Sequence, residues 1–234
     1  FEIHSGGICC YFNKKGPARD LEPFFNYKVT PGFSTPDWAK GAVFYQIYVD
    51  RFANGDPSND VLNREYIYIK EPSKKIDDWY CYPEQMDVRN FYGGDLQGVL
   101  DHLDYLKELG VDVIYLNPIF VSPSNHKYDI QDYDYIDPHY GKIVVDEGNT
   151  LPDWENNNMN ASKYISRVTD KRNLEASNEF FIHFVEEVHK KGMRVILDGV
   201  FNHCGSFNKW MDAERIYENQ YGYEKGAFVD ANSP

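Results

Sequence analysis

One short stretch of the sequence is rich in side chains that carry oxygen donors. Four of them fall within seven residues, namely Asn54, Asp56, Asn59 and Asp60. Calcium takes about six to eight oxygen ligands from carboxylates, amides and carbonyls, so this composition suits a Ca²⁺ site. An EF-hand is excluded, because its sixth position would be Asn59 where glycine is required. On spacing alone, a metal-free turn rich in Asn and Asp explains these residues equally well.

A second set of polar residues could contact a neutral ligand. Asp198 and His203 lie in the run DGVFNH, and His126 and Tyr128 lie in the run HKYD. An imidazole can hydrogen-bond a ligand hydroxyl, and a phenol ring can stack on an apolar face. A carboxylate inside an apolar strand is costly to bury without a partner, which favours a role for Asp198. Taken singly, His203 also fits a core histidine and Tyr128 a packed loop residue.

Apolar patterns predict the elements that position these residues. Three short runs rich in β-branched and aromatic residues are typical of buried parallel strands, and two segments with apolar residues at helical spacing predict helices. The strands are predicted at residues 43–49, 113–116 and 195–200, and the helices at 96–109 and 180–188.

The alternation of these strands and helices predicts a parallel sheet with right-handed crossovers. The fold class is therefore α/β, and the expected fold is the first part of a (β/α)8 TIM barrel, with strands one to three of the eight needed for closure. The connections after the first two strands are unusually long, and loops of that kind are usually functional. Residues at the carboxyl ends of barrel strands share one rim, so the polar sets should face a common site.

The N-terminal residues have a different pattern. Strand-like pieces at 2–3 and 8–12 and a Gly-Pro turn at 16–17 predict the end of a β-sandwich module that leads into a linker. The expected domains are the module end and linker at 1–35, the first half of the barrel at 36–203, and the beginning of an insertion after the third barrel strand at 204–234.

The charge balance limits the classes of partner. The formal net charge is -13, from 24 Lys and Arg against 37 Asp and Glu. An acidic surface repels phosphate backbones and anionic lipids, which predicts no nucleic-acid partner and no membrane partner. No apolar run approaches the roughly 20 residues of a membrane span. A neutral ligand is not repelled.

The four cysteines indicate neither a zinc motif nor a disulfide framework. Cys9 and Cys10 are adjacent, so a bond between them would be strained. The remaining two, Cys81 and Cys204, lie far apart in the sequence. The cysteines therefore leave the compartment open.

Together the segments resemble the α-amylase family, glycoside hydrolase family 13. The run VFYQIYVDRF at 43–52 looks like the first barrel strand, and residues 198–203 match the D-x-x-x-N-H region at strand three. The runs SPSNHKYD at 122–129 and IDPHYG at 136–141 look like the loop after strand two in the neopullulanase and cyclomaltodextrinase branch. Residues 144–176 resemble an insert of amylopullulanases.

The resemblance implies a calcium site, and it implies that the ligand is an α-glucan oligosaccharide or polysaccharide such as starch, pullulan or a cyclodextrin. The implied calcium ligands are Asn54, Asp56, Asn59, Asp60 and Asp95, with the carbonyl of Gly93.

Further roles follow from the same resemblance. His126, Tyr128 and His203 would line the subsite of the sugar whose bond is broken, and Asp198 would orient an arginine near the nucleophile. The family hydrolyses α-glucosidic bonds with retention, using a nucleophile and an acid/base carboxylate. The resemblance leaves the bond type and the oligomeric state open, and it favours an extracellular over a cytoplasmic location.

The catalytic carboxylates are expected to lie outside this sequence. The family's nucleophile belongs to a G-x-R-x-D segment, and no such segment follows His203, since Tyr217 stands two places after Arg215. We therefore expect a fragment of a glycosidase whose nucleophile and acid/base lie beyond Pro234, with no activity of its own. The alternative is a calcium-dependent glucan-binding module without catalysis.

Overall fold

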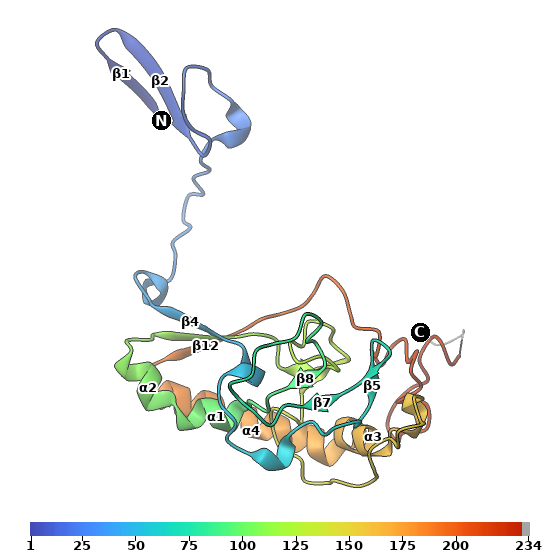
Figure 1. Ribbon diagram of the computed structural model, residues 1–234. Coiled ribbons are helices and arrows are strands. Elements are labelled where there is room, and N and C mark those ends of the chain that lie inside the picture. Colours follow the sequence, from blue (N-terminus) through green and yellow to red (C-terminus); the bar gives the residue numbers. More distant parts are fainter. Residues whose placement is uncertain (231–234) are drawn as a thin grey trace. The chain divides into compact units, whose positions relative to one another are not determined.

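The computed structural model describes residues 1–230, and the chain divides into two compact units, Phe1–Gly41 and Ala42–Pro234 (Figure 1). The division falls a few residues after the boundary predicted at residue 35. The end of the predicted segment 204–234 lies outside the described residues.

The first unit is built on a small antiparallel sheet with the strand order β1-β2-β3. The strands are β1 (Glu2–Ser5), β2 (Ile8–Asn13) and β3 (Gly16–Ala18). The two predicted strand pieces are confirmed, but the predicted Gly16–Pro17 turn is wrong, because these residues pair with Phe12 and Asn13 in the sheet. Proline is tolerated there since β3 is an edge strand. The larger β-sandwich stays a prediction.

A three-stranded parallel sheet forms the centre of the second unit, in the order β12-β9-β4. The strands are β4 (Phe44–Ile47), β9 (Val113–Leu116) and β12 (Arg194–Leu197). The three predicted strands are confirmed in type and direction, although β4 and β12 end earlier than predicted. Asp198 consequently lies just after β12 and not within it. Membership of these strands in an eight-stranded barrel stays a prediction here.

The helices are α1 (Leu96–Asp101), α2 (Leu103–Glu108), α3 (Ser162–Thr169) and α4 (Lys171–Lys190). The single helix predicted at 96–109 is interrupted at His102. Its Nδ1 donates to the Gly98 carbonyl at 2.8 Å, while its N–H turns to the Val99 carbonyl. A side chain that takes the carbonyl four residues back breaks the regular helical bonding. Helix α4 begins well before the predicted 180–188, because Asp170 caps it by accepting from the Arg172 N–H.

The core of the parallel sheet lies between β4 and β9 and the helices α1, α2 and α4, which run along one side of these strands in Figure 1. Fully buried apolar side chains fill it, including Ile47, Leu106, Ile114, Leu116 and Phe184. The apolar spacing of the two predicted helices therefore marks the faces that pack on the sheet.

The long connections carry their own structure. Short strands pair as β5 (Ile67–Tyr68) with β6 (Glu71–Pro72), β7 (Lys74–Lys75) with β8 (Asn90–Phe91), and β10 (Phe120–Val121) with β11 (Asp132–Ile136). The 3₁₀ turns are Pro23–Phe25, Asp37–Ala39, Val49–Arg51, Pro57–Asn59 and Asn158–Asn160. Among the described residues no helix has the length and apolarity needed to cross a bilayer.

A second core joins these connections. It is rich in aromatic side chains, and its buried rings include Tyr66, Phe91, Tyr164, Phe207 and Tyr217. The rings of Tyr66 and Tyr164 lie 4.0 Å apart between centroids, and the Tyr66 hydroxyl donates to the Pro123 carbonyl at 2.7 Å. The loops after β4, β9 and β12 are therefore held against one another by packed side chains.

Candidate functional site

The carboxyl ends of β9 and β12 bring two of the predicted site residues into contact. The Tyr128 hydroxyl donates to Asp198 Oδ2 at 2.8 Å, which joins the loop after β9 to the residue that follows β12. Burial raises the pKa of Tyr128 to about 12, and the hydrogen bond to Asp198 adds to this effect. Burial and Asp198 likewise raise the pKa of Tyr115, which lies on β9. A carboxylate flanked by two phenols therefore stands at this edge of the sheet.

His126 belongs to the same cluster. Its ring lies 5.9 Å from the Tyr128 ring between centroids, and its Nδ1 accepts the Tyr128 N–H at 3.1 Å. Burial lowers the pKa of His126. With Nδ1 accepting, the neutral ring carries its proton on Nε2, so that nitrogen is a hydrogen-bond donor.

His203 lies apart from these three residues. It is exposed in the loop after β12, where its carbonyl accepts from the Tyr133 hydroxyl at 2.6 Å. It lines a hollow of about 340 Å³ together with Trp210 and Tyr133, whose rings are stacked 5.6 Å apart. Among the described residues, no hydrogen bond, ion pair or ring contact joins His203 to His126, Tyr128 or Asp198.

Asp95, the residue that caps α1, accepts hydrogen bonds from the oxygen-rich loop at residues 54–60, which follows β4. Asp95 Oδ1 accepts the N–H groups of Gly55 and Gly98 at 3.1 and 2.6 Å, and Oδ2 accepts the Asp56 N–H at 2.8 Å and Asn59 Nδ2 at 3.2 Å. The Asp95 carboxylate therefore has four donors of its own and acts here as an organiser of the loop. Burial raises its pKa.

Two amide oxygens in this loop have the environment of metal ligands. Asn54 Oδ1 and Asn59 Oδ1 are buried and have no hydrogen-bond partner. Buried acceptors normally have one, so the two orphaned oxygens fit a bound cation. Asn54 Nδ2 donates to Asp60 Oδ1 at 2.8 Å, which places the Asp60 carboxylate beside them, and burial raises the pKa of Asp60. A nearby cation would oppose that rise.

Gly93 closes this group. Its φ is +85°, and a Cβ at this position would overlap Asp60 Oδ1 and lie 2.6 Å from Asn54 Nδ2. The backbone of Gly93 thus reaches the amide and carboxylate groups only because it carries no side chain. The residues present therefore fit a calcium ion.

Two of the expected ligands are already paired with lysines. Asp60 Oδ2 accepts from Lys75 Nζ, and Asp56 is paired in the same way. Asp56 Oδ2 accepts from Lys142 Nζ at 2.9 Å, and its Oδ1 accepts from the Ser58 hydroxyl at 2.5 Å. Although burial opposes it, these partners hold its pKa below the usual value. Within residues 1–230, the carboxylates of Asp56, Asp60 and Asp95 do not converge as a group of three.

Sequence reasoning missed a chain of buried ion pairs behind the rim. Lys127 Nζ donates to Asp137 Oδ2 at 2.6 Å, and the ring of His139 has Asp137 Oδ1 2.8 Å from Nδ1 and Glu65 Oε1 2.7 Å from Nε2. Glu65 Oε2 accepts in turn from Arg167 at 2.8 Å. These five side chains are at most 3% exposed.

His139 is charged in this arrangement, because each ring nitrogen faces a carboxylate oxygen and must donate. Burial alone would lower its pKa, but Glu65 and Asp137 outweigh burial and raise it. Burial would raise the pKa values of Glu65 and Asp137, but the positive charges of His139, Arg167 and Lys127 hold them below their usual range. This row of ion pairs links the loops after β4 and β9 to α3.

A further missed residue, Asn125, fixes the loop that carries His126 and Tyr128. Asn125 Oδ1 accepts from the Tyr48 hydroxyl at 2.6 Å, and its Nδ2 donates to the carbonyls of Asp87 and Asn90 at 2.5 and 2.9 Å. Asp50, two residues after Tyr48, is buried, and burial raises its pKa to about 6. The rim loop is thus anchored on the residues that follow β4.

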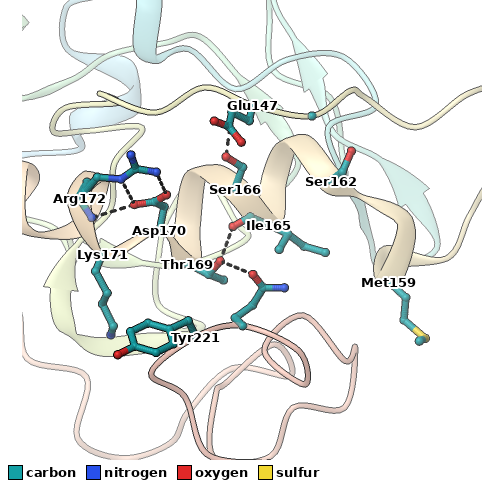
Figure 2. Close-up of a pocket in the computed structure, with 12 residues that line it drawn as sticks. Glu147, Met159, Ser162, Ile165, Ser166, Thr169, Asp170, Lys171, Arg172 and Tyr221 are labelled. Atoms are coloured by element: carbon teal, nitrogen blue, oxygen red, sulfur yellow. Dashed lines mark hydrogen bonds and ion pairs between the residues drawn. The ribbon is translucent and has the colours of Figure 1, made fainter.

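Another surface hollow lies at the junction of α3 and α4 (Figure 2). It measures about 770 Å³ and is lined in part by Ser166, Asp170, Arg172 and Tyr221. Two of its charged groups are paired with each other, since Asp170 accepts from Arg172 at 2.7 and 3.0 Å. None of the predicted site residues lines it.

Comparison with known proteins adds to this geometry. The family model of the α-amylase catalytic domain matches residues 46–147 and 176–225, which is more than half of the chain. The chain belongs to the α-amylase family. Its family is therefore one of glycoside hydrolases with a TIM-barrel catalytic domain. The unmatched residues 148–175 fall in the stretch where an insert was expected.

Among the relatives of this α-amylase-family chain, neopullulanase 2 from Thermoactinomyces vulgaris is 40% identical over 204 residues. An amylopullulanase from Thermoanaerobacter thermohydrosulfuricus is 39% identical over 201 residues. These alignments take in 85% and 80% of this chain but only 27% and 11% of the relatives. The type III pullulan hydrolase from Thermococcus kodakarensis matches in structure with a TM-score of 0.54 and 30% identity, over 76% of this chain and 26% of that protein.

Proposed function

We propose that the chain is the glucan-holding part of a retaining α-amylase-family glycosidase that cleaves α-glucosidic bonds in starch, pullulan or cyclodextrins. The observation that carries this proposal is the hydrogen bond from Tyr128 to Asp198 at the rim of the parallel sheet, with His126 alongside. An aromatic ring, an imidazole and a carboxylate lie together after β9 and β12, and this supports the proposal because barrel folds collect site residues at the carboxyl ends of their strands. The names of the relatives support the choice of glucan.

In this proposal Tyr128 supplies the surface on which a sugar ring stacks. Its orientation is fixed, because Asp198 accepts from its hydroxyl and its loop is anchored by Asn125. His126 donates from Nε2 to a sugar hydroxyl, and the exposed His203 reaches the same sugar from the loop after β12. The Asp198 carboxylate orients the arginine of the downstream nucleophile segment.

We further propose that calcium supports the rim. Asn54, Asn59 and Asp60 would bind it through side-chain oxygens and Gly93 through its carbonyl, while Asp56 and Asp95 shape the loop around it. When bound, the ion supplies positive charge to an acidic, buried loop, and thereby ties the segment after β4 to the start of α1. It takes no part in bond cleavage.

The nucleophile and the acid/base carboxylate are proposed to lie beyond Pro234, so the chain alone should bind glucans without cleaving them. Titration calorimetry with maltohexaose and reducing-sugar assays on pullulan and starch test both statements. We expect binding with no release of reducing ends. Replacing Tyr128 by alanine should weaken binding at least about tenfold, equivalent to about 1.4 kcal/mol.

The matched control is Tyr105→Ala, since Tyr105 is half-exposed on α2, outside the predicted site. Equal binding by both variants would refute the rim site, and hydrolysis by the native chain would refute the location of the carboxylates. The alternative function is a calcium-dependent glucan-binding module without catalysis. Reading the gene beyond Pro234 separates the two, because only the enzyme requires that segment downstream.

A further inference from the structure

The hairpin of β1 and β2 brings three metal-ligating side chains together. Glu2 and His4 lie on β1, and Cys9 lies on β2. The register pairs His4 directly with Cys9, and Glu2 is two residues from His4, so all three side chains leave the same face. Their ligand atoms lie within 4.8 Å of one another, the one group of this kind found among the described residues.

Two donors of this group point to a single carboxylate oxygen. His4 Nε2 lies 2.7 Å from Glu2 Oε1, and Cys9 Sγ lies 3.6 Å from the same atom. The side chains of His4 and Glu2 are 69% and 53% exposed, so an ion can reach them from solvent. Hydrogen bonding to Cys9, followed by the charges of Cys9 and Glu2, raises the pKa of the neighbouring Tyr11. The phenol therefore borders the same group.

We propose that Glu2, His4 and Cys9 form a binding site for a zinc-type divalent cation. Thiolate, imidazole and carboxylate are the ligands that Zn²⁺ takes in proteins, at about 2.0 to 2.3 Å, and a water completes four-coordination when the protein supplies three. Calcium and magnesium are poor occupants, because they require about six or more oxygen ligands. The site thus differs in chemistry from the oxygen-rich loop after β4.

Binding of the ion exchanges hydrogen bonds for metal bonds without any redox step. The Cys9 thiol loses its proton to solvent and binds as thiolate, and His4 binds as neutral imidazole through a nitrogen lone pair. Glu2 loses the hydrogen bonds from His4 and Cys9 and binds the ion through its carboxylate. The metal then links β1 to β2 from the exposed face of the hairpin.

A metal link suits the composition of this unit. Asn13 is the one buried residue in Phe1–Gly41, and large apolar side chains such as Phe1, Ile3 and Ile8 are exposed. Because little apolar surface is buried within Phe1–Gly41, a metal held by side chains would add a link that packing does not supply. The cysteines of the chain are free, so no disulfide serves this purpose among the described residues. Spacing rules missed the site because its ligands meet through strand register.

Cobalt(II) tests the proposal, because a cobalt–thiolate bond has a charge-transfer band that oxygen ligands do not produce. The full chain, kept in a thiol-free reductant, should show this band with one equivalent of Co²⁺, and Zn²⁺ should abolish it by displacement. Cys9→Ser should lose the band. His4→Gln and Glu2→Gln should weaken cobalt binding at least about tenfold.

The matched control is Cys10→Ser, because the neighbouring side chain leaves the opposite face of β2. A triple variant without Cys10, Cys81 and Cys204 should keep the band in full. The proposal is overturned if the native chain gives no thiolate band, if the band survives in Cys9→Ser, or if the triple variant loses it.

Discussion

Replacing His139 by glutamine should cost the second unit a large part of its stability. In the native chain both ring nitrogens donate to buried carboxylates, Asp137 at 2.8 Å and Glu65 at 2.7 Å. Glutamine can still donate one hydrogen bond, but it carries no charge. Asp137 would keep Lys127, and Glu65 would keep Arg167. The four remaining charges would balance, but both carboxylates would lose the buried positive charge of the imidazolium ring and one of them would lose its hydrogen bond.

The size of the effect follows from the loss of that charge. Removing one partner of a buried ion pair costs about 3 to 5 kcal/mol. Because glutamine retains one donor and each carboxylate keeps a cation, we expect the lower end, about 3 kcal/mol. For a unit of this size such a loss lowers the melting temperature by roughly 6 to 12 °C.

The pH dependence of stability has a definite sign. The folded-state pKa of His139 is raised, so its contribution is fully present below the unfolded value of about 6.5 and is lost as pH rises through the folded pKa. The pKa values of Asp137 and Glu65 are lowered, so their contributions are present above about pH 4 and are lost as pH falls through the folded values. The glutamine variant should lack the decline on the alkaline side.

Urea unfolding followed by near-UV circular dichroism, at a series of pH values, measures both effects. His183→Gln is the matched control, since its side chain is 56% exposed and its Nδ1 lies 3.9 Å from Glu187, so a change within about 0.5 kcal/mol is expected. A loss for His139→Gln no larger than that of the control would refute the charged role of this histidine. An unchanged alkaline slope would refute its raised pKa.

Three further results are expected. Calcium at about 100 times its dissociation constant should stabilise the chain by about 2.7 kcal/mol in thermal scans with and without chelator, and Asn54→Ala should abolish this difference. Gly93→Ala should lower the free energy of unfolding by about 1 to 3 kcal/mol more than Gly110→Ala, because both have a φ of +85° but only Gly93 faces a crowded neighbour. Tyr128→Phe should weaken maltohexaose binding by about two- to tenfold in calorimetry, since one hydrogen bond to Asp198 is lost; unchanged affinity would contradict its orienting role.

The sequence predicted those parts of the fold that depend on local patterns. The three parallel strands and the apolar faces of α1, α2 and α4 follow from periodicity, which depends on neighbours along the chain. The break at His102 could not be predicted in this way, because it depends on whether one side chain takes the Gly98 carbonyl. Helix α3 was missed since it lies in a stretch that was taken as an insert.

The candidate site was predictable in its residue types and less so in its connections. The rim pair Tyr128 and Asp198 follows from the rule that strand ends share one edge of a sheet. The burial of Lys127 and His139 could not be predicted from the sequence, because charged loop residues are usually exposed. These two are buried because partners distant in the sequence compensate their charges. The strand register that unites His4 with Cys9 is likewise invisible to spacing rules.

The most direct test of the central claim is a crystal structure of this chain with maltotriose. We predict a glucose ring stacked on Tyr128, with its hydroxyl groups within hydrogen-bond distance of His126 and Asp198. A sugar bound only in the hollow lined by Tyr133, Trp210 and His203, with none on Tyr128 at the ends of β9 and β12, would contradict the assignment of this rim to glucan binding.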